Sequence, residues 1–338
     1  MEEKPQTPQM PRLGITQGDI NGIAYEIILK AFSDSRMLTE MTPVLYGQSK
    51  VLSYYKKNFG IEDFNYSLTR DVRQAWAQKF NILNVVEHEL KIDSGQVTPL
   101  SAEMAVLSLK MAAEDLKNGY LDALVMAPAC RSVDGTQGDF LASTFGKPNT
   151  LRLLVSDFMR MGLATDDRPL REALGMLNPD FIAQKLNVLS QALKTDFGLN
   201  APKIAVMGLD PHSGEKDFAK ADDEVTKALA EAKKNDVLAY GPFSAARLFV
   251  TGDWKKYDAV LALTYDQGVL PFKLMSVNGY AYYWAGLPSV CTGPLHGPAF
   301  DMANTNTATP DAIRNSLYVR YVDLKSGKTE NRLVNKNR

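Results

Sequence analysis

The sequence has 338 residues, of which 45% are hydrophobic and 23% are charged, enough for two globular domains with separate cores. This composition excludes a disordered or fibrous chain. The formal net charge is -1, and no stripe of lysine and arginine interleaved with aromatics follows the chain, so nucleic acid is excluded as an expected partner.

The chain shows no sign of a membrane or secretory segment. Its first residues are polar, and nowhere do about 18 uncharged apolar residues follow one another. Its two cysteines, Cys130 and Cys291, lie far apart, which favours a reducing compartment over a disulfide scaffold. We therefore expect a cytoplasmic protein without membrane contact.

The folded part opens with residues 13–27, LGITQGDINGIAYEI, which predict a buried strand, a tight glycine turn and the start of a helix. Gly18 and Gly22 permit backbone conformations closed to other residues, and the first N–H groups of a helix can hold an anion or a polar ligand. Asp19 is then expected at the mouth of a cleft as a substrate-binding residue. The alternative is an ordinary turn between a strand and a helix.

Short apolar runs and helical patterns alternate further along the chain. A helix is predicted over 101–118 with Gly119 as its C-cap, and no Gly-x-Gly-x-x-Gly, Walker A or Gly-x-Ser-x-Gly motif occurs. The alternation predicts an α/β fold with parallel sheets and ligands at the carboxyl ends of the strands. The predicted strands are residues 43–46, 81–86, 122–126, 203–207 and 258–263.

Four further segments carry a resemblance that covers nearly the whole chain. They are GLDPHSGE at 208–215, YDAVLALTYDQG at 257–268, GLP at 286–288 and LHGPAFDMA at 295–303. With residues 13–27, they resemble the 4-hydroxythreonine-4-phosphate dehydrogenases, NAD-dependent enzymes of pyridoxal phosphate biosynthesis.

The resemblance implies a fold like that of isocitrate and isopropylmalate dehydrogenases, with two α/β/α domains and mainly parallel sheets around a central cleft. Residues 1–130 plus 290–338 would form the first domain, with the cofactor loop. Residues 131–289 would form the inserted second domain, with the substrate and metal side and the dimerisation surface. It also implies a homodimer whose subunits complete each other's active sites.

The same resemblance implies an NAD-binding loop, in which His296, Gly297, Ala299 and Asp301 match the family and Asn304 stands where glycine is usual. The alternative is a helix N-terminus with His296 as a buried hydrogen-bonding residue.

The family reaction oxidises a secondary alcohol and then releases carbon dioxide, with a divalent metal such as zinc or magnesium held by three histidines. His212 matches one ligand, whereas Gln137, with Asp139 nearby, and Tyr265 fall at the other two. The chain has only three histidines in all: His88, His212 and His296. One imidazole with an amide and a neutral phenol is a poor zinc site, so the sequence predicts that the family's metal site is lost.

The implied phosphate pocket has changed as well. Cys130 and Arg131 replace a His-Lys pair, whereas Lys273 matches the substrate-binding lysine. An aspartate, an asparagine and an arginine of the family are replaced by Ala246, Tyr282 and Cys291. The bulky rings of residues 280 and 282–284 predict a pocket filled or reshaped for a flatter, less charged molecule. The expected roles are His212 and Asp266 at the reacting hydroxyl, and Lys273 and Arg131 toward an anionic group of a small-molecule substrate.

Three functions remain open. The first is an NAD-dependent dehydrogenase of this family with altered substrate or metal use, and the second is a non-catalytic paralogue that binds a ligand or partner in the remodelled cleft. The third is a metal-free dehydrogenase with Tyr265 or Lys273 as its base. Whether the chain is an enzyme is left undecided by its residues.

The two cysteines allow a further hypothesis. With His212, Asp139 and Asp266 they could form a new soft-metal or thiol site. The alternative is that both are small apolar fillers.

Overall fold

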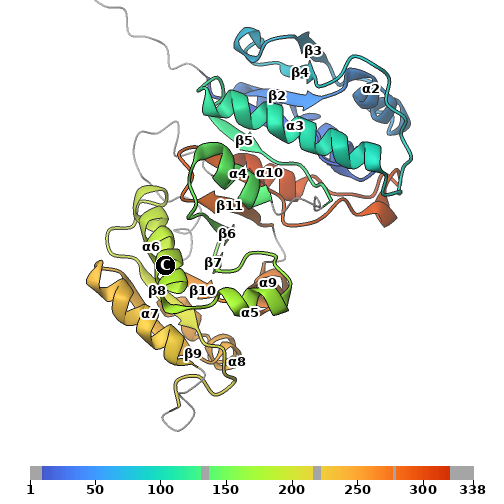
Figure 1. Ribbon diagram of the computed structural model, residues 1–338. Coiled ribbons are helices and arrows are strands. Elements are labelled where there is room, and N and C mark those ends of the chain that lie inside the picture. Colours follow the sequence, from blue (N-terminus) through green and yellow to red (C-terminus); the bar gives the residue numbers. More distant parts are fainter. Residues whose placement is uncertain (1–9, 131–136, 216–221, 277–278, 320–338) are drawn as a thin grey trace, which may run out of the picture. The chain divides into compact units, whose positions relative to one another are not determined.

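The computed structural model describes residues 10–130, 137–215, 222–276 and 279–319. The chain divides into two compact units, unit 1 from residues 1–135 and 289–317 and unit 2 from residues 136–288 and 318–338 (Figure 1). In the described part of the chain, no helix has the length and apolar character needed to cross a membrane.

The sheet strands of unit 1 run in the order β3-β4-β2-β1-β5-β12, and every neighbouring pair is parallel. β1 and β2 are buried almost throughout, as expected of strands covered on both faces. The strands are β1 (Arg12–Thr16), β2 (Thr42–Gly47), β3 (Tyr66–Thr69), β4 (Phe80–Asn84), β5 (Ala123–Val125) and β12 (Val290–Gly293).

The long helix of unit 1, α3 (Pro99–Lys117), packs on β1, β2 and β5, and Figure 1 shows it beside β2 and β5. Thr98 caps its first turn by accepting from the Ser101 N–H, Pro99 stands at its start, and Gly119 follows its end with a φ of 75°. The other helices are α1 (Ala24–Phe32), α2 (Ser49–Asn58) and α10 (Asp311–Tyr318), with the 3₁₀ turns η1 (Ser35–Thr39), η2 (Val72–Gln74) and η5 (Phe300–Met302).

The strands of unit 2 run in the order β11-β6-β7-β10-β8-β9. The pairs β11–β6 and β6–β7 are antiparallel, whereas the pairs from β7 to β9 are parallel. The strands are β6 (Leu151–Val155), β7 (Arg160–Leu163), β8 (Lys203–Met207), β9 (Leu238–Phe243), β10 (Ala259–Ala262) and β11 (Ala281–Ala285).

Helix α6 packs on β6 and β11 with α7 beside it, and α9 packs on β7 and β10. Asn178 caps α6 by accepting from the Phe181 N–H, ahead of a proline at the first helical position. The helices of unit 2 are α4 (Gln137–Phe145), α5 (Leu170–Met176), α6 (Pro179–Thr195), α7 (Asp223–Lys234), α8 (Ala245–Val250) and α9 (Tyr265–Met275), with the 3₁₀ turn η4 (Asp253–Lys256).

The predicted α/β class with mainly parallel strands is confirmed, as are the five predicted strands and the helix that ends before Gly119. The antiparallel strands β6, β7 and β11 were not predicted. β11 carries the bulky rings that were interpreted as pocket residues, and Tyr282, Tyr283 and Trp284 are at most 5% exposed. Those rings are therefore core side chains of a strand.

Candidate functional site

The loop between β1 and α1 is closed by its own hydrogen bonds. The Asp19 carboxylate accepts from the Asn21 N–H at 2.9 Å and from the Ser101 hydroxyl at 3.1 Å, and its side chain is fully buried. Burial raises the pKa of Asp19. Asp19 is therefore buried, with one carboxylate oxygen bonded to its own loop and the other to the start of α3, and its role in substrate binding stays a prediction.

The start of α1 is occupied by protein as well. The Ile23 N–H donates to the Pro298 carbonyl at 2.9 Å, and an added Cβ at Gly22 would lie 2.5 Å from that same oxygen. The glycine thus permits the close approach of the 296–304 loop rather than of an anion. The two sequence segments therefore support each other, and ligand binding at this helix start stays a prediction.

The predicted cofactor loop lies between β12 and α10, with Gly297, Asp301 and Asn304 exposed and His296 half-buried. Nothing lies within 4 Å of the place where a Cβ on Gly297 would stand, so a ligand can reach the backbone there. His296 Nδ1 lies 3.0 Å from the Gly297 carbonyl, which fixes the ring over the loop. These residues fit a dinucleotide, with an exposed carboxylate at Asp301 for sugar hydroxyls.

The backbone conformation of Asn304 accounts for an asparagine at a position where the family usually has glycine. Its φ is 62°, a left-handed conformation that glycine adopts freely and that asparagine tolerates best among other residues. Ala299 is left-handed too, with a φ of 45°, although alanine rarely is. The change at residue 304 therefore preserves the shape of the loop.

Neither cysteine is suited to thiol chemistry. Cys291 is fully buried and Cys130 half-buried, and burial raises both pKa values, aided at Cys130 by the charge of Asp19. A raised pKa leaves little thiolate, the reactive form. These findings favour the apolar-filler interpretation.

In unit 2, several predicted residues follow the carboxyl ends of β8 and β10. The Gln267 amide donates to the Gly208 carbonyl at 2.7 Å and accepts from the Leu263 N–H at 2.8 Å, which ties the two loops together. The side chains of His212 and Asp266 are exposed, and His212 Nδ1 lies 3.6 Å from a Glu215 oxygen. This edge of the sheet is where parallel strands present ligand-binding residues.

Burial shifts the pKa values of two candidate bases on α9, Lys273 and Tyr265, in opposite directions. Burial lowers the pKa of the half-buried Lys273, for which no ion pair occurs among the described residues. Burial raises the pKa of Tyr265, the first residue of the same helix. Since a base must lose its proton near neutral pH, the lysine is the better candidate.

The family's metal does not fit the residues at its expected positions. Gln137 Oε1 already accepts from the Tyr282 hydroxyl at 3.0 Å, and Tyr265 stays a neutral phenol because its pKa is raised. Within the described ranges, no group of three or more His, Cys, Asp and Glu side chains could hold a metal ion. His212 is then a single imidazole, which supplies too few donors.

Sequence reasoning missed the charged cluster at this end of unit 2. Arg152, the second residue of β6, is only 8% exposed and lies 2.8 Å from Asp166, while Arg168 donates to both oxygens of Asp139 at 2.7 and 2.9 Å. The signal was available, because a lone arginine in the apolar run LRLLV needs a buried partner.

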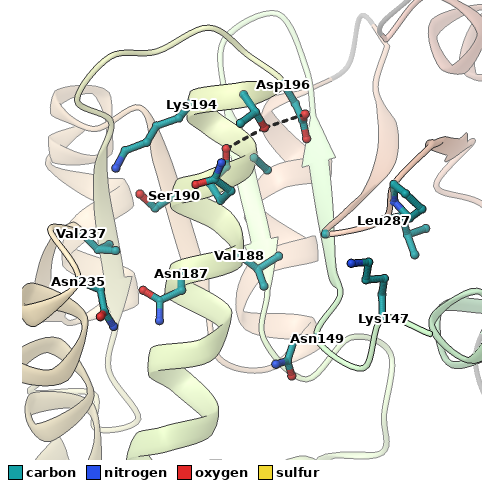
Figure 2. Close-up of a pocket in the computed structure, with 15 residues that line it drawn as sticks. Lys147, Asn149, Asn187, Val188, Ser190, Lys194, Asp196, Asn235, Val237 and Leu287 are labelled. Carbon is teal, nitrogen blue, oxygen red and sulfur yellow. Dashed lines mark hydrogen bonds between the residues drawn. The ribbon is translucent and has the colours of Figure 1, made fainter. Parts of the chain in front are cut away.

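A separate hollow of about 560 Å³ lies against α6, and Figure 2 shows the polar side chains around it. Lys147, Asn149 and Asn187 line it together with Lys194, while Asp196 at its edge accepts from the Tyr283 hydroxyl at 2.6 Å. None of the predicted site residues belongs to it. The predicted residue Arg131 lies outside the described residues.

Solved structures of known proteins share the fold of this chain. The solved isocitrate dehydrogenase of Methylococcus capsulatus shares the fold at a TM-score of 0.51 and 11% identity, covering 94% of this chain and 86% of that one. A solved Salmonella typhimurium protein provisionally identified as 4-hydroxythreonine-4-phosphate dehydrogenase matches at a TM-score of 0.77 and 26% identity, covering 92% and 99%. The fold is thus that of isocitrate dehydrogenase-like α/β proteins.

Residues 39–320 match the family Pyridoxal phosphate biosynthetic protein PdxA, and the chain belongs to this family. The 4-hydroxythreonine-4-phosphate dehydrogenase of Bacteroides thetaiotaomicron is 33% identical over 318 residues, 91% of this chain and 87% of the relative. A Cutibacterium acnes protein provisionally named D-threonate 4-phosphate dehydrogenase is 31% identical over 326 residues, 92% and 93% of the two chains. The predicted family is confirmed.

Proposed function

We propose that this chain is an NAD-dependent dehydrogenase that oxidises a small phosphorylated hydroxy acid without the family's metal site. The relatives named above act, by their names, on two different 4-phosphorylated compounds, which supports the phosphorylated class but leaves the particular acid open. The observation that carries the proposal is Lys273, a half-buried lysine with a lowered pKa in the segment that matches the family's substrate-binding lysine.

In this proposal NAD supplies the hydride acceptor. Lys273 Nζ, deprotonated, takes the proton of the substrate hydroxyl as the carbon is oxidised to a ketone, and Asp266 and His212 orient that hydroxyl. Gly297 and Asp301 in the 296–304 loop would hold the adenosine end through backbone and carboxylate contacts. Dimerisation through unit 2 and a role of Arg131 at the phosphate remain part of the same proposal.

The first test is a calorimetric titration with NAD. We expect micromolar binding by the wild-type protein, with Asp301→Ala weakening it and Asp311→Ala, an exposed residue at the start of α10, leaving it unchanged. No binding in any buffer, with or without zinc or magnesium, would refute the dehydrogenase.

The second test identifies the base in a screen of phosphorylated hydroxy acids. Lys273→Met should reduce turnover about 100-fold or more, whereas Tyr265→Phe should retain it. Lys185→Met is a matched control, because Lys185 also has a burial-lowered pKa but donates to the Thr150 carbonyl at 2.6 Å as a structural residue. Equal rates in Lys273→Met and wild type would remove Lys273 from the mechanism.

The alternative, a non-catalytic paralogue, is favoured by two observations. The rings of Tyr282 and Trp284 are buried rather than open to a ligand, and the family's substrate-contacting position 291 holds a fully buried cysteine. NAD binding without turnover of any phosphorylated hydroxy acid would support this alternative.

A further inference from the structure

Arg152 lies at the centre of the antiparallel part of unit 2. In β6 it stands opposite Trp284 of β11 and opposite Leu163 of β7, and it is 8% exposed. A guanidinium stays charged at any physiological pH, so this strand position holds a permanent buried positive charge. Such a charge is costly unless other groups compensate it.

Two aromatic rings compensate part of that cost. The guanidinium carbon lies 4.9 Å from the centroid of the Trp284 ring and 5.3 Å from that of Tyr282. The two rings also meet edge to face, with centroids 6.2 Å apart. The hydroxyl of Tyr282 donates to Gln137, which links the cation to the first expected metal-ligand position.

Two carboxylates complete the compensation. Arg152 Nε lies 2.8 Å from Asp166 Oδ1, a charge contact outside hydrogen-bond geometry, and Arg152 Nη2 lies 3.8 Å from Asp167 Oδ2. The Thr165 hydroxyl donates to the Leu263 carbonyl at 2.8 Å, which brings this turn beside the start of α9. Tyr265 is the first residue of α9, so the turn that carries Asp166 and Asp167 lies near the second replaced ligand position.

We propose that Arg152, held by Asp166, Asp167 and the two rings, is a built-in cation that keeps divalent metal ions out of the region around Gln137 and Tyr265. A divalent ion would have to displace the guanidinium from both carboxylates or bind beside a like charge. The meaning of this cluster for catalysis rests on the proposed function, but its effect on metal binding does not.

The test compares the wild type with Arg152→Gln and Arg152→Lys in the full chain. Terbium(III) binds carboxylates and emits when nearby tryptophan or tyrosine is excited, so emission that Tyr265→Phe reduces reports an ion beside Tyr265, and Mn²⁺ calorimetry gives the affinity. We expect no such emission from the wild type and an affinity gain of about tenfold or more in Arg152→Gln, which removes the positive charge beside both carboxylates. Arg152→Lys keeps the positive charge and should behave like the wild type.

His212→Ala serves as the background control, because the exposed His212 and Glu215 can bind metal weakly at the surface. One Mn²⁺ or Zn²⁺ per wild-type chain that persists in His212→Ala and is lost in Tyr265→Phe would overturn the proposal. So would a folded Arg152→Gln variant with no gain in affinity. If circular dichroism shows Arg152→Gln unfolded, the wild-type, His212→Ala and Tyr265→Phe titrations decide alone.

NAD titration of the same variants separates this inference from the proposed function. If the wild-type protein binds NAD and also a metal ion beside Tyr265, only the proposal that Arg152 excludes metal is contradicted. If the wild-type protein binds neither NAD nor a metal ion, only the proposed dehydrogenase function is contradicted.

Discussion

The carbonyl oxygen of Pro298 accepts from the Ile23 N–H at 2.9 Å, so the loop expected to hold NAD rests directly on the glycine turn before α1. These residues are 275 positions apart in the chain, and neither segment alone indicates the contact. The shape of the 296–304 loop therefore depends on the turn before α1.

Gly22→Ala should disturb that support. Its Cβ would lie 2.5 Å from the Pro298 oxygen, and overpacking of this kind costs about 1–3 kcal/mol. We expect a lower free energy of unfolding by urea denaturation and weaker NAD binding. Gly175→Ala is the control, because nothing lies within 4 Å of its Cβ position inside α5, and it should stabilise the protein by up to about 1 kcal/mol.

Ala299→Gly should stabilise the protein or leave its stability unchanged. Alanine at a φ of 45° carries a left-handed strain of about 1–2 kcal/mol, which glycine relieves at some cost in unfolded-state entropy. Asn304→Gly should gain less, since asparagine tolerates its φ of 62° better. A clear loss of stability in Ala299→Gly, measured by thermal unfolding, would mean that the methyl group packs more favourably than the strain costs.

Gly138→Ala should destabilise unit 2, because the added Cβ would overlap the Cη2 atom of Trp284. The expected loss is about 1–3 kcal/mol. Trp284→Phe removes that part of the ring, so the double variant should lose less than the two single losses combined. Strict additivity in chemical denaturation would show that the two residues do not meet in this way.

Asp166 should give the stability a particular pH dependence. Burial raises its pKa to about 6 from an ordinary 3.8, opposed by Arg152 and reinforced by Asp167 and Asp139. Between these two values the folded protein binds a proton that the unfolded chain does not, so this group favours folding more as the pH falls. Relative to Asp166→Asn, the wild type should gain up to about 3 kcal/mol between pH 7 and pH 4.

Urea unfolding of both proteins at several pH values measures that difference. A constant difference across the range would mean that Asp166 titrates alike in the folded and unfolded states. Asp157→Asn, which changes an exposed aspartate between β6 and β7, is the control and should show no such trend.

Much of the fold could be predicted from the sequence. Apolar runs bounded by turns gave the strands β1, β2, β4, β5, β8 and β10, and Thr98, Pro99 and Gly119 mark the ends of α3 by local backbone chemistry. Signals of this kind depend on neighbours along the chain. Strands β6 and β11 were not predicted, because Arg152 and the rings of residues 282–284 carry polar groups that are typical of a pocket.

The sequence by itself determined the family, the α/β class and the loss of two of the three histidines expected at the metal. Only the tertiary structure decided that the buried Asp19 carboxylate accepts hydrogen bonds from Asn21 and Ser101. It also decided that Asn304 takes a conformation typical of glycine and that Arg152 lies between two rings and two carboxylates. The reason is physical. Whether a charged or polar group binds a ligand or stabilises the fold depends on its burial and its partners, and those partners are supplied by residues distant in the chain.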